Sequence, residues 1–243
     1  IAHTTSDWPR RMSPAAKTRR LLVRISMIVF LTAAISSIIF QSTTFALPKM
    51  FDEKLQGVAG AFVAWINDWR TGSQTTSATM VGAFAFIVFA VASLAQLVVG
   101  ALLDRLGPRK VFLTMAAIQM VFFAIMPGLF GWPALLVALC FMIGAFGSIP
   151  INDYMVGKMA SGDFRARVYG VRYVVSFTSL ALALPLIGSI HQRWGFDTLF
   201  LVLSACAAVI LAAVSLLPQR LPTPVLAAPS PPAASGSIAL AKA

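Results

Sequence analysis

The chain has 243 residues, of which 58% are hydrophobic and only 11% are charged. Soluble domains carry about 25% charged residues, so the composition excludes an ordinary water-soluble domain and predicts a protein that lies in a lipid bilayer. The net charge of +11 does not indicate a nucleic-acid partner, because the basic residues form short clusters between long apolar stretches.

Six stretches are long and apolar enough to cross a bilayer, which takes about 20 residues. Residues 1–20 precede them as a basic cytoplasmic linker, and residues 219–243, rich in Pro, Ala and Ser, follow as a predicted disordered cytoplasmic tail. The sequence therefore predicts an all-α membrane protein with a six-helix bundle over residues 21–218. The predicted spans are residues 21–47, 79–103, 111–130, 133–151, 171–190 and 198–217.

The distribution of Lys and Arg predicts the orientation of the bundle. Of the 19 basic residues, only Lys49, Lys54, Arg70 and Arg193 lie in loops on one side of the membrane. Because cytoplasmic loops collect positive charge, the opposite side, which carries both termini, is predicted to be cytoplasmic. An even number of spans requires the two termini to share a side, which agrees with this assignment.

The outside segment between the first two spans carries one apolar helical face. Its spacing in steps of four and three predicts an amphipathic helix over about residues 51–70, with two Trp suited to the membrane interface. Both a passive interfacial helix and a lid that gates a transport path fit the pattern. The face consists of Phe51, Leu55, Val58, Phe62, Trp65 and Trp69.

Two loops of the chain resemble each other at an offset of 88 residues, LVVGALLDRLGPRKVF at 97–112 and PLIGSIHQRWGFDTLF at 185–200. Each loop joins the second and third helix of a three-helix set, the first on the cytoplasmic side and the second outside. Repeats of opposite topology are a common plan of transporters, so the sequence predicts two inverted three-helix repeats. The shared pairs are Gly100 and Gly188, Arg105 and Arg193, Gly107 and Gly195, and Phe112 and Phe200.

Polar residues within the spans concentrate on the first two helices of each repeat. Ser, Thr and Gly commonly pack membrane helices together, but stripes confined to these helices also fit the lining of a transport path. The third helix of each repeat is nearly bare and is predicted to face mostly lipid. The stripes comprise Ser37, Gln41, Thr44, Ser93, Gln96, Ser148, Asn152, Arg172, Ser176 and Ser179.

The segment GALLDRLGPRK, residues 100–110, resembles the signature loop of the major facilitator superfamily. Its glycines, its aspartate and its basic residues fill every position of that pattern, namely Gly100, Asp104, Arg105, Gly107, Arg109 and Lys110. The resemblance implies a gating motif whose contacts form and break during alternating access. In physical terms, a glycine allows close helix approach or a tight turn, and Asp104 suits the positive N-terminus of a neighbouring helix.

Such transporters normally have twelve spans, so the resemblance implies that this chain is one half and that a second six-helix half is its partner. We expect the C-terminal half, because a basic linker precedes the first span and RVYGVRYVVSFTSLALALPLIGSIHQRWGF resembles the eleventh helix of bacterial members. The first residue is Ile1 rather than Met, which predicts preceding sequence. The implied function is secondary transport of a small-molecule substrate across a bacterial inner (plasma) membrane.

Helices that correspond to spans one and four line the central cavity of this family. The resemblance therefore makes cavity and substrate candidates of Gln41, Thr43, Thr44, Asn152, Asp153 and Tyr154. Asp153 lies near the cytoplasmic end of its span, and Arg172 enters the membrane at a similar depth on the next helix. We expect these two residues to form a structural ion pair, with a proton relay through Asp153 as the alternative.

Two other functions remain open, namely a stand-alone six-helix subunit that works as a homodimer and an intramembrane enzyme. The chain has only two histidines, His3 and His191, and it carries no HExxH or GxSxG motif, so we expect no enzyme and no catalytic residue. Cys140 and Cys206 lie inside apolar stretches, as small hydrophobic residues do. We therefore expect no disulfide, no metal site and no cofactor.

Overall fold

The computed structural model describes residues 14–69, 75–159 and 165–217, and the regular structure within these ranges is α-helical. Residues 14–20 of the predicted basic linker form the first turns of a helix, whereas the predicted tail 219–243 lies outside the described residues. The helices in chain order are α1 (Pro14–Lys54), α2 (Gln56–Trp69), α3 (Ser77–Leu106), α4 (Pro108–Ile125), α5 (Gly131–Met159) and α6 (Arg165–Ser215).

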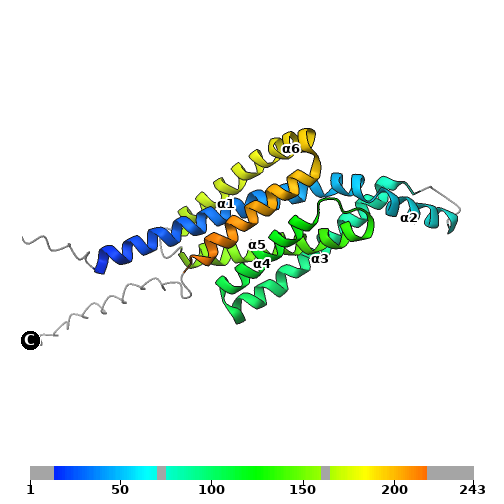
Figure 1. The fold of residues 1–243 in the computed structure, drawn as a ribbon. Coiled ribbons are helices and arrows are strands. Elements are labelled where there is room, and N and C mark those ends of the chain that lie inside the picture. Colours follow the sequence, from blue (N-terminus) through cyan, green and yellow to red (C-terminus); the bar gives the residue numbers. More distant parts are fainter. Residues whose placement is uncertain (1–13, 70–74, 160–164, 218–243) are drawn as a thin grey trace, which may run out of the picture.

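Five of these helices, all except α2, are long and apolar enough to cross a membrane. The sequence predicts six spans, and the difference lies in α6. The backbone of Gly195 is non-helical, with φ 77° and ψ −179°, and divides α6 into residues 165–194 and 196–215. Figure 1 shows the chain turning back at this bend, so that the second arm (orange) runs in the opposite direction to the first (yellow). Because only Gly195 separates the two arms, α6 counts as a single helix. Each arm nevertheless has at least the roughly 20 residues that a membrane crossing needs.

Helix α1 is longer than the predicted span over residues 21–47. It continues through Pro48, which lies inside the helix, to Lys54. Proline inside a membrane helix is tolerated when neighbouring groups compensate for the lost hydrogen bond. Met50 and Phe51 are completely buried after Pro48, so the packing of this extension outweighs the tendency of proline to end a helix.

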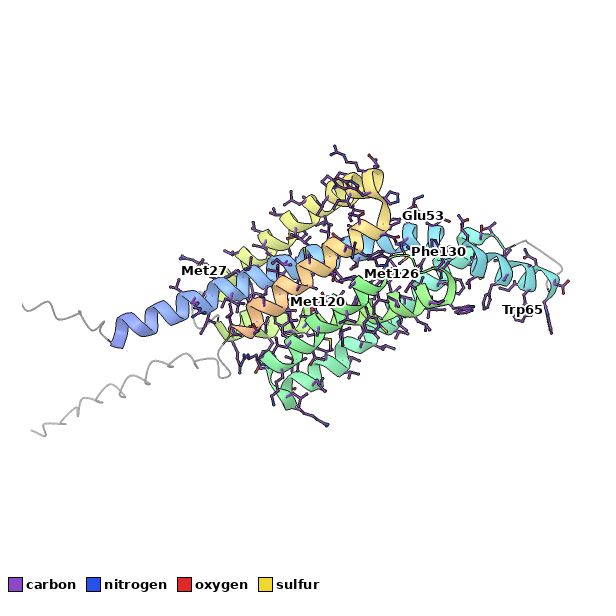
Figure 2. The ribbon with its side chains drawn as sticks, in the orientation of Figure 1. Met27, Glu53, Trp65, Met120, Met126 and Phe130 are labelled. Atoms are coloured by element: carbon purple, nitrogen blue, oxygen red, sulfur yellow. The ribbon has the colours of Figure 1, made fainter. Side chains whose placement is uncertain are left out.

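Helix α2 begins at Gln56, later than the expected start near residue 51, because Phe51 belongs to α1 and Leu55 lies at the break between the two helices. The far end of α2 carries Trp65 and Trp69, whose side chains are exposed (Figure 2). Nearer the bundle, the ring of Phe62 meets the rings of three aromatic residues edge to face. These are Trp65 on α2 itself, Phe84 on α3 and Trp132 on α5.

The second arm of α6 packs against α4 and α5 around an aromatic core. The rings of Phe123 and Phe141 lie 4.8 Å apart, and the ring of Phe200 lies 5.5 Å from that of Phe141. Ser204 Oγ donates a hydrogen bond of 2.8 Å to the carbonyl of Met120, which ties the two helices together. Helix α4 and the second arm of α6 correspond to the two spans that the sequence predicts to face mostly lipid. Each of them has an inner face that packs against the other, as well as an apolar outer face.

Close helix approach occurs at Gly144 of α5. A Cβ atom there would lie 2.8 Å from Gln119 Cγ and 3.3 Å from the carbonyl oxygen of Met115, so α4 and α5 need the missing side chain. At Gly100, where the sequence predicts such an approach, a Cβ atom would meet nothing within 4 Å in the described part of the chain. Gly147 on α5 is similarly close, with 2.9 Å from a Cβ atom to Met115 Sδ, so the close approaches described here lie on α5 and not in the signature loop.

We predict that Gly144→Ala destabilises the bundle by about 1–3 kcal/mol, because the added methyl group overpacks the α4–α5 contact. The measurement is the thermal unfolding midpoint of the purified protein in detergent. Gly82→Ala on α3 is the matched control, since a Cβ atom there meets nothing within 4 Å of the described structure. Alanine in that helix should be neutral or stabilise by up to about 1 kcal/mol. Equal midpoints for the two variants would contradict the close approach.

Candidate functional site: a polar cleft and two related loops

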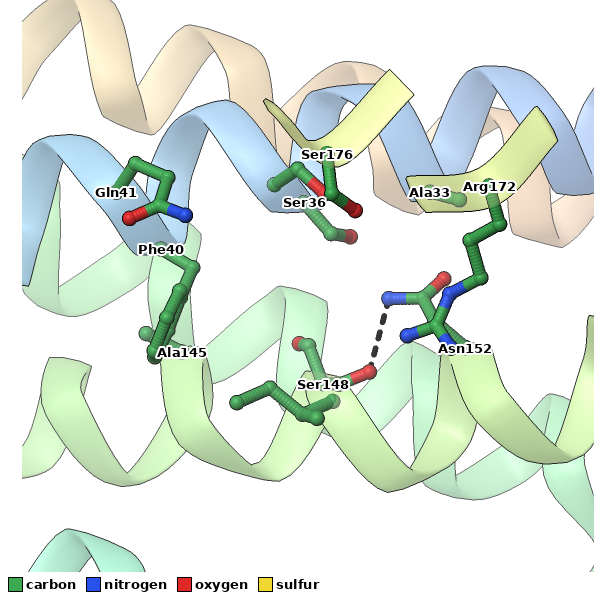
Figure 3. Close-up of a pocket in the computed structure, with 11 residues that line it drawn as sticks. Ala33, Ser36, Phe40, Gln41, Ala145, Ser148, Asn152, Arg172 and Ser176 are labelled. Carbon is green, nitrogen blue, oxygen red and sulfur yellow. Dashed lines mark hydrogen bonds between the residues drawn. The ribbon is translucent and has the colours of Figure 1, made fainter. Parts of the chain in front are cut away.

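A cleft of about 180 Å³ lies between α1, α5 and the first arm of α6 (Figure 3). Its walls are unusually polar for helices of such high hydropathy, and they combine hydroxyl groups, two side-chain amides and one guanidinium. The lining residues are Ala33, Ser36, Ser37, Phe40, Gln41, Ala145, Ser148, Ile149, Asn152, Arg172 and Ser176. Polar groups that converge in one hollow of an apolar bundle identify this cleft as the candidate binding site.

Two polar atoms at the cleft have no hydrogen-bond partner among the described residues. They are Ser36 Oγ and Asn152 Oδ1, on side chains that are 6% and 5% exposed. The amide nitrogen of Asn152 donates a bond of 2.8 Å to the carbonyl of Ser148, which fixes the orientation of this amide (Figure 3). Buried polar atoms normally find partners, so these two atoms have hydrogen-bonding capacity that no described residue uses.

Gln119 of α4 supports the cleft wall from behind. This buried side chain donates through Nε2 to the carbonyl of Gly144 at 2.8 Å and to Ser148 Oγ at 2.7 Å. The hydroxyl of Ser148 also donates to the carbonyl of Gly144 at 3.0 Å, so its rotamer is fixed. The sequence shows Gln119 only as an isolated polar residue on a bare span, and no spacing pattern connects it with Ser148.

Arg172 and Asp153 form an ion pair between the first arm of α6 and α5. The nitrogen Nη1 of Arg172 faces Asp153 Oδ1, and the Arg172 side chain also lines the cleft. Asp153 is not among the lining residues. An arginine within a membrane-crossing helix is costly unless a counter-charge compensates it, and Asp153 supplies that charge.

Four of the six predicted cavity residues, Thr43, Thr44, Asp153 and Tyr154, do not line the cleft. The hydroxyl groups of Thr43 and Thr44 donate to carbonyls of their own helix, Thr43 to Ile39 at 2.8 Å and Thr44 to Phe40 at 2.7 Å. The ring of Tyr154 packs beside the core, with Lys158 Nζ 4.8 Å from its centroid. Gln41 and Asn152 do line the cleft, and Asp153 borders it through Arg172.

The signature loop forms a turn centred on Gly107. This residue has φ 81° and ψ 158°, a conformation that favours glycine, and it separates the end of α3 from Pro108 at the start of α4. Arg109 Nη2 donates a hydrogen bond of 2.7 Å to the carbonyl of Ser215 at the end of α6. Asp104, Arg105 and Lys110 are exposed, and no described residue makes a hydrogen bond or ion pair with Asp104.

The loop around Gly195, whose sequence resembles that of the signature loop, has a similar backbone conformation. Gly195 has φ 77° and ψ −179°, close to the values of Gly107. Asp197 accepts hydrogen bonds from Lys54 Nζ at 2.7 Å and from the backbone N–H of Gly128 at 3.2 Å. The side chain of Lys54 is only 5% exposed, so its charge depends on this carboxylate.

The contacts of the two loops are related by the offset of 88 residues that relates their sequences. Arg109 and Asp197 are separated by this offset. Arg109 contacts Ser215 at the end of α6, and Asp197 contacts Gly128 just beyond the end of α4. In the first loop the side chain donates to a carbonyl group, and in the second it accepts from an N–H group. The structure thus adds a geometric likeness to the four sequence identities.

These features define a class of protein, a helical membrane bundle with a polar cleft between membrane-crossing helices. A family model of the Major Facilitator Superfamily matches residues 29–242 of the chain. The chain therefore belongs to this superfamily of membrane transporters. No curated protein matches the chain.

The polar stripes of the sequence analysis include Ser148, which stands four residues before Asn152 on the same helical face and lines the cleft. Sequence reasoning did not select Ser36 or Phe40, although both line the cleft. Ser36 and Phe40 share a similar spacing on α1. Phe40 is apolar, so its place at the cleft follows from how α1 is rotated against α5, which no sequence pattern reports.

We predict that Asp197→Ala destabilises the protein by about 2 kcal/mol, because it leaves the buried ammonium group of Lys54 without its carboxylate. Thermal unfolding in detergent measures the effect. The double variant Lys54→Met with Asp197→Ala should recover most of the loss, since it removes both charges together. A double variant no more stable than the single one would contradict the dependence of Lys54 on Asp197.

Proposed function

We propose that this chain is the C-terminal six-helix half of a twelve-helix secondary transporter that moves a small polar solute by alternating access. The observation that carries the proposal is the polar cleft between α1, α5 and the first arm of α6. Membership of the superfamily supplies the class of activity. The cleft supplies the place where one half of such a transporter would contact its solute.

The shape of the cleft supports a site shared between two halves. It is open on one side, and its volume of about 180 Å³ is smaller than the roughly 300–1,000 Å³ of sites that enclose a ligand. In a transporter built from two halves that rock around a central site, each half contributes one wall. The missing six-helix half would complete the enclosure.

The signature loop suits the role of a gate. Arg109 fastens the start of α4 to the end of α6, while Asp104 has no hydrogen bond or ion pair within the described part of the chain. An exposed carboxylate in this position is free to meet the N-terminus of a helix in the other half, where the helix dipole favours negative charge. We infer that this contact forms in one state of the transport cycle and breaks in the other.

The two arms of α6 support six crossings arranged as two inverted three-helix repeats. In this arrangement α1, α3 and α4 form the first repeat, and α5 and the two arms of α6 form the second. The equal backbone conformations of Gly107 and Gly195 favour the repeat. The asymmetry of Lys and Arg favours cytoplasmic termini in a bacterial inner membrane.

A homodimer of this chain is the second candidate, because self-association would also close the open side of the cleft. The polar surface of the first arm of α6 favours some partner, since Arg172 and Ser176 would otherwise lie beside lipid. An intramembrane enzyme has less support. No group of His, Cys, Asp and Glu that could hold a metal ion occurs within the described residues.

We predict that the 243-residue chain alone does not transport, and that co-expression with the six helices encoded upstream of it restores transport. Proteoliposomes of each preparation would be screened for uptake of labelled sugars, amino acids and organic acids, with and without a proton gradient. Saturable uptake by the single chain would contradict the half-transporter proposal and favour the homodimer. Failure of both preparations across the panel would contradict transport by this cleft.

We predict that α6 crosses the membrane twice, so that its bend and its end lie on opposite sides. In a Cys140→Ala, Cys206→Ala background, Gln192→Cys should react with an impermeant thiol reagent added to intact cells. Leu216→Cys should react only after the membrane is opened. Both side chains are exposed in the structure, so burial does not account for a difference. Labelling of Leu216→Cys from outside would contradict the second crossing.

A further inference from the structure

The chemistry of the cleft indicates which kind of solute it suits, an inference that rests on the proposed transport function. Arg172 is the one basic residue among the lining residues, and its side chain is 20% exposed. A guanidinium group has five N–H donors in a fixed planar arrangement. Asp153 faces Nη1 from outside the lining set, which leaves other donors of the group at the cleft.

The ion pair positions Arg172 as well as neutralising it. Asp153 is held on α5, next in sequence to Asn152, so the carboxylate draws the guanidinium group toward the part of the cleft where the Asn152 amide lies. Figure 3 shows the Arg172 side chain extending toward Asn152 from the neighbouring helix. A charged donor and a neutral acceptor therefore lie together at one end of the cleft.

The acceptor atoms are the second independent observation. Asn152 Oδ1 and Ser36 Oγ have no hydrogen-bond partner in the described structure, although both side chains are more than nine-tenths buried. The amide nitrogen of Asn152 is already committed to the carbonyl of Ser148, so the amide presents its oxygen. A ligand that satisfies this end of the cleft needs an anionic group for Arg172 and an O–H or N–H donor for Asn152.

The cleft is small, about 180 Å³, so this wall of the site suits a compact polar group of the ligand. We propose that the cleft binds a small hydroxycarboxylate or aminocarboxylate, with its carboxylate on Arg172 and its hydroxyl or amino group donating to Asn152 Oδ1. A neutral polyol would leave the guanidinium group without an anionic partner at the cleft, and a simple cation would meet its repulsion.

The test measures whether such acids shield the cleft. Ile149 lines the cleft, so Ile149→Cys in the Cys140→Ala, Cys206→Ala background places a single thiol there. The rate of maleimide labelling would be measured in membranes with lactate, malate or serine, and with lactamide, malamide and serinamide as their uncharged counterparts. An acid present at about ten times its dissociation constant should slow labelling by roughly tenfold, because only the empty site reacts. The matching amide should have little effect.

Variants test whether the protection from labelling depends on Arg172 and on Asn152. Arg172→Gln with Asp153→Asn removes both charges of the pair, so no unpaired charge remains in the membrane, and it should abolish protection by the acids. Asn152→Asp should also abolish it, because a second carboxylate repels the ligand. Lys54→Met with Asp197→Asn, which removes an ion pair far from the cleft lining, is the matched control and should keep full protection.

The outcomes separate this inference from the proposed function. Protection by at least one acid, lost in the cleft variants and kept in the control, would support the inference even if the chain alone transports nothing. Equal protection by acids and amides, or protection that survives loss of Arg172, would overturn it. Absence of protection by all three acids would also overturn it, and uptake of a sugar in the transport screen would then leave the transport function standing.

Discussion

Hydrocarbon offers no hydrogen bonds, so the backbone groups of a chain that crosses it must be satisfied within helices. The connections between crossing helices are correspondingly short where the structure describes them. One residue, Gly107, separates α3 from α4, and one residue, Gly195, separates the arms of α6. Both need a backbone conformation with positive φ that glycine adopts without strain. These two turns reverse the chain between α3 and α4 and between the arms of α6, while the cleft lies between α1, α5 and the first arm of α6.

The lack of hydrogen-bond partners in hydrocarbon also applies to the polar side chains, most of which find a partner within the protein. Thr43, Thr44 and Ser179 donate to carbonyls of their own helices, which satisfies them without any neighbour. Gln119 joins α4 to α5 and holds the cleft wall in place. The polar atoms of the cleft that remain without such partners are therefore the ones that distinguish a binding surface from helix packing.

Sequence patterns predicted where the membrane helices lie far better than how they are rotated. Hydropathy locates a span to within a few residues, but it did not predict that α1 continues through Pro48, because the packing of Phe51 decides that. Arg172 and Asp153 were predictable as a pair, since their charges enter neighbouring helices at similar depth. Ser36 and Thr43 stand seven residues apart on nearly the same face of α1, but only Ser36 lines the cleft, because the cleft ends before Thr43 along the helix.

If the two loops belong to inverted repeats, as proposed, the difference between Arg109 and Asp197 has a consequence for how the same contact can be kept on both sides of a membrane. An exact copy of the first loop would place three basic residues outside, the counterparts of Arg105, Arg109 and Lys110, which opposes export, whereas the second loop keeps only Arg193. In the first loop a basic side chain donates to a carbonyl group, and in the second an acidic side chain accepts from an N–H group. The donor and the acceptor are exchanged, and the hydrogen bond is kept. In the proposed orientation, each loop keeps a hydrogen bond to the end of a distant helix, and the outside loop carries fewer basic residues than the cytoplasmic loop.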